Sequence, residues 1–392
     1  MGMSAIIGRG RTVDTMAEHT PVPRVALEHT RGDRTPLDSV LTEHAHAAQV
    51  PTLADLLETM RVVSIPMNTQ FRGVTVREAA LFEAPNGWVE FSPFLEYEPL
   101  EASTWLASAL DAGWLPQPQP LRHSIPVNAT LPAVGPAEVP LVMERYGDLT
   151  NLHTVKVKVA GKNTTLEADI ARLQALRSFV GDEVRIRIDV NGLWSLPDAL
   201  DALAILEPFD LEYVEQPVRT VEELAELREQ LAVRKIAIPI AADESIRKAD
   251  DPLRVAALGA ADLIIVKAQP LGGAHRILSI VESTGLPTVV SSALDTAVGI
   301  AFGARVAAAL PHLDHACGLG TGALFAGDVV GETSDDSVQA LPGHVRDFRT
   351  VPGWPVPSPK KLARFEAAAD RRAWWASRVT SCFDLLSRKP PQ

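Results

Sequence analysis

The chain has 392 residues, of which 46% are hydrophobic and 22% charged, as is usual for a globular protein. Its net charge of −12 argues against a nucleic-acid partner, because a phosphate-binding surface needs a basic excess. Cys317 and Cys382, the two cysteines, give neither a disulfide framework nor a zinc spacing. No apolar run is long enough to span a membrane, and no apolar segment follows Arg9 and Arg11 as in a secretory signal. We therefore expect a cytoplasmic protein without a membrane partner.

Residues 1–56 show little periodicity and are expected to form an N-terminal extension, disordered or loosely structured. They contain several prolines and the stretch Glu43-His44-Ala45-His46. Two histidines at this spacing can bind zinc, but no third ligand lies nearby, so we interpret them as ordinary polar residues.

Residues 57–124 predict a small α+β domain. Runs rich in β-branched and aromatic residues indicate three strands, at residues 61–67, 74–84 and 87–94. Pro85-Asn86-Gly87 predicts a hairpin turn between the last two strands. Residues 100–114 carry apolar side chains at helical spacing. We expect this domain to stand in front of the next one.

Residues 125–325 predict a parallel (β/α) barrel. Five apolar runs end in charged residues, which are Lys158, Asp189, Glu215, Asp243 and Lys267. These ends follow one another at intervals of 24 to 31 residues, with helical patterns between them. A strand–helix unit of such a barrel takes about 30 residues, and the C-terminal ends of its strands carry the chemistry. We therefore expect the charged side chains to form an active site at one mouth.

The other barrel elements are placed by the same patterns. A first strand is expected at residues 125–130, a seventh ending at Ser291 and Ser292, and an eighth near residues 315–321. Helices are expected at residues 166–179, 197–206, 221–232, 252–258, 273–284 and 296–309.

Residues 326–392 are expected to pack back on the small domain. They are proline-rich at first and then predict one helix over residues 362–379, whose tryptophans we interpret as packing residues. Two loops of the small domain, residues 66–72 and 93–97, are placed to reach the barrel mouth. Arg72 is therefore a candidate substrate-binding residue.

Three carboxylates on consecutive strand ends predict a metal site. Asp189, Glu215 and Asp243 supply oxygen ligands of the kind that Mg²⁺ prefers, and Mn²⁺ is expected to substitute. Neither cysteine nor histidine lies at these strand ends, which disfavours zinc. Glu244 adjoins Asp243 and is expected on the opposite face of the strand, away from the metal.

Lys156 and Lys158 lie two residues apart and therefore share a strand face. Lysines that face a barrel interior are costly unless they serve a site. Nearby positive charge, from each other, from Lys267 and from the metal, is expected to lower their pKa. A lysine that is neutral near pH 7 can act as a general base, while a metal opposite it stabilises an enediolate.

These motifs resemble the enolase superfamily, and in particular its muconate-lactonising subgroup. The Lys-x-Lys pair, the Asp/Glu/Asp set and the later lysine all match. The stretches KVKVAG, DVNG, VEQP and ADES resemble the actinobacterial o-succinylbenzoate synthases. The resemblance covers roughly residues 57–392. It implies a modified (β/α)8 barrel, i.e. (β/α)7β, with an α+β capping domain.

The resemblance also implies a reaction. It is the Mg²⁺-dependent syn dehydration of 2-succinyl-6-hydroxy-2,4-cyclohexadiene-1-carboxylate in menaquinone biosynthesis, through an enediolate. Lys158 matches the base that also protonates the leaving hydroxyl, Lys156 its supporting residue, and Lys267 the lysine that stabilises the enolate. The other matched positions are Asn191 beside the metal ligands and Ser291, Gly318 and Gly320 at the succinyl end of the substrate.

Other activities stay open at this point. N-succinylamino acid racemases use the same lysine pair, and muconate cycloisomerases share the scaffold. Dipeptide epimerases usually carry Asp-x-Asp where this chain has Gly318-Leu319-Gly320. A Schiff-base lyase using Lys267 would not need the three carboxylates. A non-catalytic binding protein would be expected to have lost one of the charged residues, and none is missing.

Overall fold

The computed structural model describes residues 50–161, 164–248, 251–330 and 342–387, all within one compact unit of the chain. The histidine pair near residue 44 lies outside these ranges. Helix α2 (Leu53–Thr59) begins inside the expected extension, ends beyond it, and was not predicted. Thr52 and Asp55 form a capping box at its N-terminus, and Leu56 is buried. Regular structure therefore begins before residue 56.

A three-stranded antiparallel sheet follows, as predicted. Its strands are β1 (Arg61–Phe71), β2 (Val74–Ala84) and β3 (Gly87–Phe91), paired in that order. Strand β1 is longer than expected, so the turn to β2 is Arg72-Gly73, where both residues have positive φ. Helix α3 (Pro99–Trp114) packs on β3 and buries Trp105.

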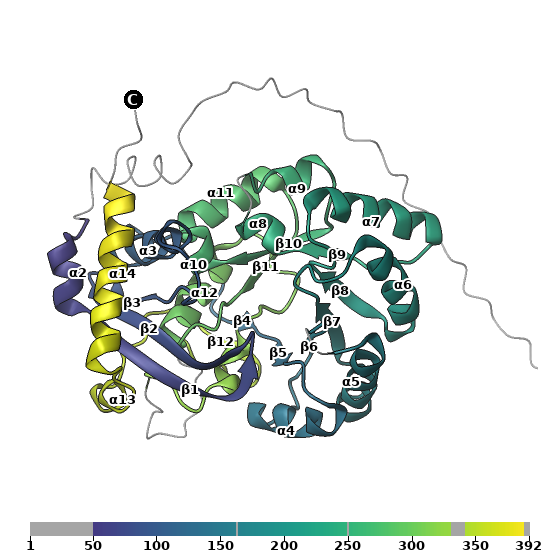
Figure 1. Ribbon diagram of the computed structural model, residues 1–392, viewed down its shortest axis with the longest axis horizontal. Helices are drawn as coiled ribbons and strands as arrows, with labels where there is room; N and C mark the ends of the chain where they lie inside the picture. The colour runs from purple at the N-terminus through teal and green to yellow at the C-terminus, as the bar shows by residue number, and fades with distance from the viewer. Residues whose placement is uncertain (1–49, 162–163, 249–250, 331–341, 388–392) are drawn as a thin grey trace, which may run out of the picture. The chain divides into compact units, whose positions relative to one another are not determined.

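Seven parallel strands form a second, curled sheet (Figure 1). In sheet order they are β5 (Ala129–Leu131), β6 (Thr154–Lys158), β7 (Arg185–Asp189), β8 (Leu211–Glu215), β9 (Ile240–Ala242), β10 (Leu263–Lys267) and β11 (Thr288–Ser291). The expected eighth strand consists of two isolated parallel bridges, Val127 with Cys317 and Ser291 with Gly318. These bridges lie between β11 and the start of β5, and the expected (β/α)7β architecture is confirmed.

The prediction for the first strand was wrong in part. Residues Ile125–Pro126 form β4, which pairs antiparallel with β12 (Arg349–Thr350) and not with the barrel. Pro126 has no N–H with which to continue a ladder. The next N–H, that of Val127, donates to the carbonyl of Phe348 at 2.8 Å. Only Ala129–Leu131 joins the parallel sheet.

The expected helices of the barrel are all present. They and the short helical segments between them are η1 (Pro136–Glu138), α4 (Val139–Met143), η2 (Glu144–Tyr146), α5 (Leu166–Val180), α6 (Leu196–Leu206), η3 (Glu207–Phe209), α7 (Val221–Arg234), α8 (Glu244–Arg247), α9 (Arg254–Ala257), α10 (Ala268–Leu271), α11 (Ala274–Thr284), α12 (Ala297–Ala309) and η4 (Gly320–Leu324). Helices α4, α8 and α10 were not predicted. Over the described ranges, no helix has the length and apolar character needed to cross a membrane.

The single C-terminal helix that we expected is two helices, α13 (Pro359–Arg364) and α14 (Ala369–Ser387). The helix is interrupted because residues 365–367 pair with the edge of β1. Ser64 N–H donates to Phe365 O at 2.8 Å, and Ala367 N–H to Val62 O at 2.9 Å.

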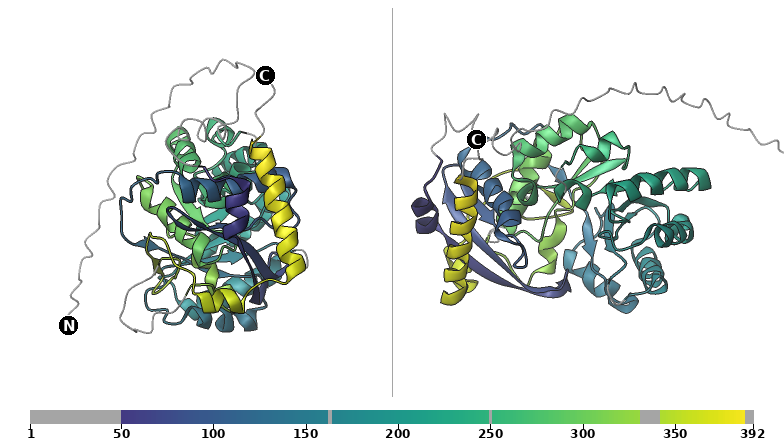
Figure 2. Two further views of the ribbon diagram at one scale, coloured as in Figure 1. Left: turned by 90° about the vertical axis from the view of Figure 1, so that its left-hand side faces the viewer. Right: turned by 45° about the horizontal axis from the view of Figure 1, so that its top comes forward.

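Helix α14 lies along the antiparallel sheet and α3 (Figures 1 and 2). Trp375 packs edge-on against Phe91 and donates to Glu78 at 2.7 Å. The tryptophan is therefore a packing residue, as expected. We call β1–β3, α3 and α14 together the cap.

Asp111 of α3 ties the cap to the barrel. Its carboxylate accepts from Ala274 N–H at 2.9 Å, at the start of α11, and contacts His275 Nδ1. Gly273 leaves room for this carboxylate, because a Cβ there would collide with it. The hydrogen bond to Asp111 raises the pKa of His275 above its usual 6.5, although burial opposes the shift.

We predict that His275 stabilises the protein more at low pH than at high pH. Because its pKa is raised on folding, its contribution is complete below about pH 6.5 and is lost as pH rises through the folded-state pKa. Urea unfolding of the unmodified protein and of His275→Gln, between pH 5.5 and 9, should show a difference that shrinks as pH rises. In an Asp111→Asn background the pH dependence should weaken. A difference that grows with pH would contradict this account.

Candidate active site

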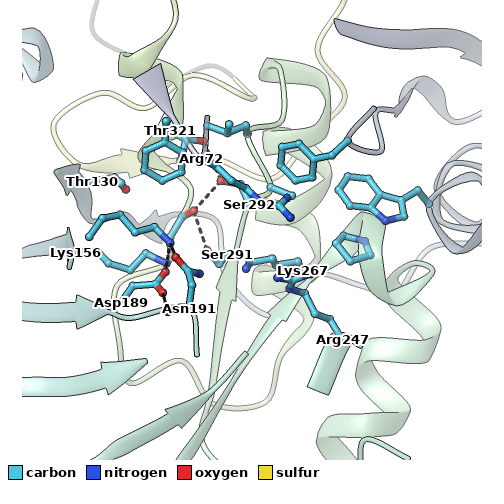
Figure 3. Close-up of a pocket in the computed structure, with 18 residues that line it drawn as sticks. Arg72, Thr130, Lys156, Asp189, Asn191, Arg247, Lys267, Ser291, Ser292 and Thr321 are labelled. Atoms are coloured by element: carbon cyan, nitrogen blue, oxygen red, sulfur yellow. Dashed lines mark hydrogen bonds and ion pairs between the residues drawn. The ribbon is translucent and has the colours of Figure 1, made fainter. Parts of the chain in front are cut away.

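A pocket lies at the C-terminal ends of the barrel strands, where the cap meets them (Figure 3). The cap supplies Phe71 and Arg72 from the β1–β2 turn, Phe94 from the loop after β3, and Trp105 from α3. Both loops that were expected to reach the mouth therefore do so. The barrel supplies the charged groups described next.

Asp189 is the centre of one charged cluster. It ends β7, is completely buried, and its Oδ2 lies 3.2 Å from Lys156 Nζ and in contact with Lys158 Nζ. The two lysines point the same way, as their spacing on β6 predicts. Lys156 Nζ also lies 3.1 Å from both oxygens of Glu215. Glu215 stands directly beside Asp189 in the register of β7 and β8.

Asp243 is the centre of a second cluster. It follows β9, its Oδ2 contacts Lys267 Nζ, and its Oδ1 lies 3.2 Å from Arg247 Nε. Figure 3 shows Lys156, Asp189 and Asn191 on one side of the pocket, and Lys267 with Arg247 on the other.

The pKa shifts follow from burial and from these neighbours. Burial lowers the pKa of Lys158, and the charge of Lys156 lowers it further, against the pull of Asp189. Lys156 behaves oppositely: burial opposes its charge, but Glu215 and Asp189 outweigh burial and raise its pKa. The expectation of a lowered pKa is thus right for Lys158 and wrong for Lys156. Burial and the charges of Asp189 and Asp243 raise the pKa of Glu215 to about 7, although Lys156 opposes them.

The donor set suits a hard divalent cation. Three completely buried carboxylates stand at adjacent strand ends, and burial, together with the charges of Asp189 and Asp243, raises the pKa of Glu215, an effect that a bound cation would oppose. In the described part of the chain, however, no three acidic, histidine or cysteine side chains converge on a single point. Each carboxylate is instead turned toward an ammonium group.

Two polar residues fix the loops that follow the metal-ligand candidates. Asn191, at a positive φ of 54°, donates from its backbone N–H to Asp189 at 3.1 Å and accepts from Lys158 Nζ at 2.8 Å. Gln216 was not predicted. It is buried and accepts from the backbone N–H groups of Asp243 and Ser245, at 3.0 and 3.1 Å.

The substrate-binding candidates lie in different places. Arg72, Ser291 and Gly318 line the pocket, whereas Gly320 does not. A Cβ at Gly320 would collide with the carbonyl oxygen of Asn128, so packing alone requires this glycine. Arg72 donates to Tyr97 Oη at 2.8 Å and lies 3.9 Å above the ring of Phe94.

Several pocket residues were missed in the sequence, among them Thr130, Arg247, Ser292 and Thr321. Arg247 could have been found: it lies four residues after Asp243, the spacing at which helical side chains meet. We treated Asp243 and Glu244 as strand residues, but Glu244 opens helix α8. Its carboxylate lies 2.5 Å from Arg247 and 3.4 Å from Asn191, at the site and not on an opposite strand face.

Two family models match the chain. Residues 139–347 match the enolase C-terminal domain-like family, and residues 62–113 match the enolase N-terminal domain-like family. The chain therefore belongs to the enolase superfamily, whose members use a divalent metal ion.

Two relatives are similar to this chain along almost their whole length. The o-succinylbenzoate synthase of Mycobacterium marinum is 49% identical over 339 residues, which cover 86% of this chain and 97% of that one. The o-succinylbenzoate synthase of Mycolicibacterium smegmatis is 48% identical, covering 85% and 98%. The chain belongs to the o-succinylbenzoate synthase family.

Solved structures show the same fold at lower identity. The muconate lactonizing enzyme of Pseudomonas fluorescens superposes with a TM-score of 0.63 at 21% identity, covering 79% of this chain and 98% of that one. The L-Ala-D/L-Glu epimerase of Bacillus subtilis gives 0.60 at 20% identity, covering 76% and 96%.

We predict that Gly320→Ala destabilises the protein through packing. The new Cβ meets backbone, which cannot move aside as a flexible side chain can, so the cost should be about 1–3 kcal/mol. Gly322→Ala is the matched control in the same η4 segment. Apart from its neighbours along the chain, no atom of the described residues lies within 4 Å of its Cβ position, and its effect should stay within about 0.5 kcal/mol. Equal unfolding midpoints for the two variants would show that packing does not require Gly320.

Proposed function

We propose that this protein is an o-succinylbenzoate synthase. It removes water from 2-succinyl-6-hydroxy-2,4-cyclohexadiene-1-carboxylate and forms 2-succinylbenzoate for menaquinone biosynthesis. The observation that carries the proposal is one pocket with Lys158 on one side, Lys267 on the other, and three buried carboxylates behind them. The near full-length similarity to synthases supports the choice of substrate.

Lys158 is the general base in this proposal. Its lowered pKa increases the fraction of free amine, which removes the proton from the carbon beside the substrate carboxylate. The resulting ammonium then gives that proton to the departing hydroxyl, and the ring becomes aromatic as water leaves. One group serves both steps, so the proton and the hydroxyl leave from the same face. Lys156 stays charged and holds Asp189 and Glu215 in place.

Lys267 works through its charge. It stands across the pocket from the Lys158 side and compensates the negative charge that develops on the substrate carboxylate. Arg72, Ser291 and Gly318 are proposed to contact the substrate, and Asn191 orients Lys158 through its hydrogen bond.

Asp189, Glu215 and Asp243 would hold Mg²⁺, with Mn²⁺ as a substitute. The bound ion supplies a Lewis acid that withdraws electron density from a carboxylate. The bound ion would also replace the lysines as the positive charge that compensates the three carboxylates. We place the enzyme in the cytoplasm, because Cys317 and Cys382 are both free.

An N-succinylamino acid racemase is the second candidate. Two lysines on opposite sides of one pocket suit proton exchange at both faces of a carbon, as a racemase requires. Dehydration and racemisation assays, run side by side with Mg²⁺, decide between the two. We expect dehydration to be the main activity, and faster racemisation would overturn the assignment.

We predict that removal of the metal abolishes activity and that Mg²⁺ or Mn²⁺ restores it. Glu215→Gln should weaken Mg²⁺ binding in calorimetric titrations, because an amide is a poorer ligand than a carboxylate. Glu212→Gln is the control on the same strand. Glu212 pairs with Arg187 at 2.7 Å, away from the three carboxylates, so this change should leave Mg²⁺ affinity unaltered. Full turnover in excess EDTA would exclude the metal site.

We predict that Lys158→Ala lowers kcat by about two to four orders of magnitude, the usual range for a general base. Lys267→Arg keeps the charge but cannot exchange a proton, because a guanidinium stays protonated. This variant should retain part of the dehydration, limited by the fit of the larger group, and lose racemisation altogether. Retention of more than about a tenth of the rate in Lys158→Ala would contradict its role as base.

A further inference from the structure

Arg77 of β2 is a buried cation outside the charged clusters of the pocket. It is 2% exposed and makes no ion pair with any residue that the structure describes. Its donors go to uncharged oxygens: Nε to Leu294 O at 2.9 Å, and Nη2 to Ala293 O at 3.2 Å and Ser92 Oγ at 3.1 Å. Burying a guanidinium is costly unless its charge and its donors are both satisfied. The nearby charges of Glu90 and Asp295 favour the cation, and its donors bind the carbonyls of residues 293 and 294.

The two carbonyls belong to the wall of the pocket. Ala293 and Leu294 line it, immediately after Ser291 and Ser292. Leu294 has a φ of 61°, a left-handed conformation that a leucine rarely adopts. A turn of this kind needs support from outside, and Arg77 provides it from a strand 217 residues away in the sequence.

The residues that follow β10 are also hydrogen-bonded to this part of the cap, near the end of β3. Gln269, two residues beyond Lys267, accepts from Ser92 N–H at 2.9 Å and donates to Asp295 at 2.9 Å. Glu90 accepts from the first turn of α12, with Gly299 N–H at 2.9 Å. The buried polar side chains of β2 and β3 therefore connect to the segments that follow two adjacent barrel strands.

We infer that Arg77 is a positioning residue for substrate binding, a role that rests on the proposed function. It fixes the turn at Ala293 and Leu294, so the cap shapes the pocket wall through a side chain that does not touch the substrate. Ala293 and Leu294 line the pocket but supply none of the charged groups of the proposed chemistry. Loss of Arg77 therefore raises KM more than it lowers kcat.

The test compares Arg77→Ala and Arg77→Lys with the unmodified enzyme in the dehydration assay. KM should rise at least about tenfold in both, because a displaced wall weakens binding of the substrate and of the transition state alike. Guanidinium chloride at low millimolar concentration should lower KM in Arg77→Ala, relative to the same concentration of NaCl. Arg122→Ala is the matched control. Arg122 likewise donates to carbonyls, those of Ala307 and Leu310 at 2.8 and 2.6 Å, but at the opposite end of α12. The KM of Arg122→Ala should stay within about twofold of the unmodified value and should not change when guanidinium is added.

Each outcome either supports or overturns the positioning role of Arg77. A folded Arg77 variant with the KM of the unmodified enzyme overturns the role, as does an equal rise in Arg122→Ala. If Arg77→Ala does not fold, the KM of Arg77→Lys decides alone. If Arg77→Ala folds with a raised KM, failure of guanidinium to lower it also overturns the role. Absence of dehydration in the unmodified protein overturns the proposed function and this role with it, whereas activity with an unchanged KM in the variants overturns this role alone.

Discussion

Three completely buried carboxylates need cations beside them, and the arrangement of this site follows from that need. Asp189 and Glu215 are register neighbours on parallel strands, so their charges are forced together. Lys156 is held between them, and Lys267 compensates Asp243. Removing one partner of such a pair leaves an uncompensated buried charge, at a cost of about 3–5 kcal/mol. The side chains that we propose for the chemistry are thus also the ones that make the end of the barrel stable.

The cap makes this compensation effective. Without it, the strand ends would face water, where ion pairs contribute little. Phe71, Phe94 and Trp105 close the pocket with apolar surface, and a low dielectric strengthens the interaction of fixed charges with a developing one. Asp111 and Arg77 then bind the cap to segments that follow the barrel strands. The barrel therefore supplies the charge of the site, and the cap supplies its enclosure.

The elements of the fold and the site residues that depend on local sequence pattern could be predicted. Apolar runs that end in charged residues gave the strand ends, so Lys158, Asp189 and Glu215 were placed correctly, as was the helix that begins at Leu166. What could not be predicted depends on partners distant in the sequence. The break near Phe365 exists because β1 offers an edge there, and Arg77 contacts residues more than 200 positions away. No local spacing carries that information.

Residues 317–320 close the barrel between β11 and the start of β5, and they bear on which reaction the protein performs. The fold alone does not decide this, because enzymes of other activities share it at about 20% identity. At Gly318 a Cβ would collide with Ser291 Oγ, and at Gly320 with the carbonyl oxygen of Asn128. The Asp-x-Asp that we associate with dipeptide epimerases therefore cannot enter this segment without moving both neighbours. Gly318 and Gly320 themselves offer no carboxylate to a substrate ammonium group. The packing that closes the barrel thereby favours a substrate whose groups are anionic or neutral at that end.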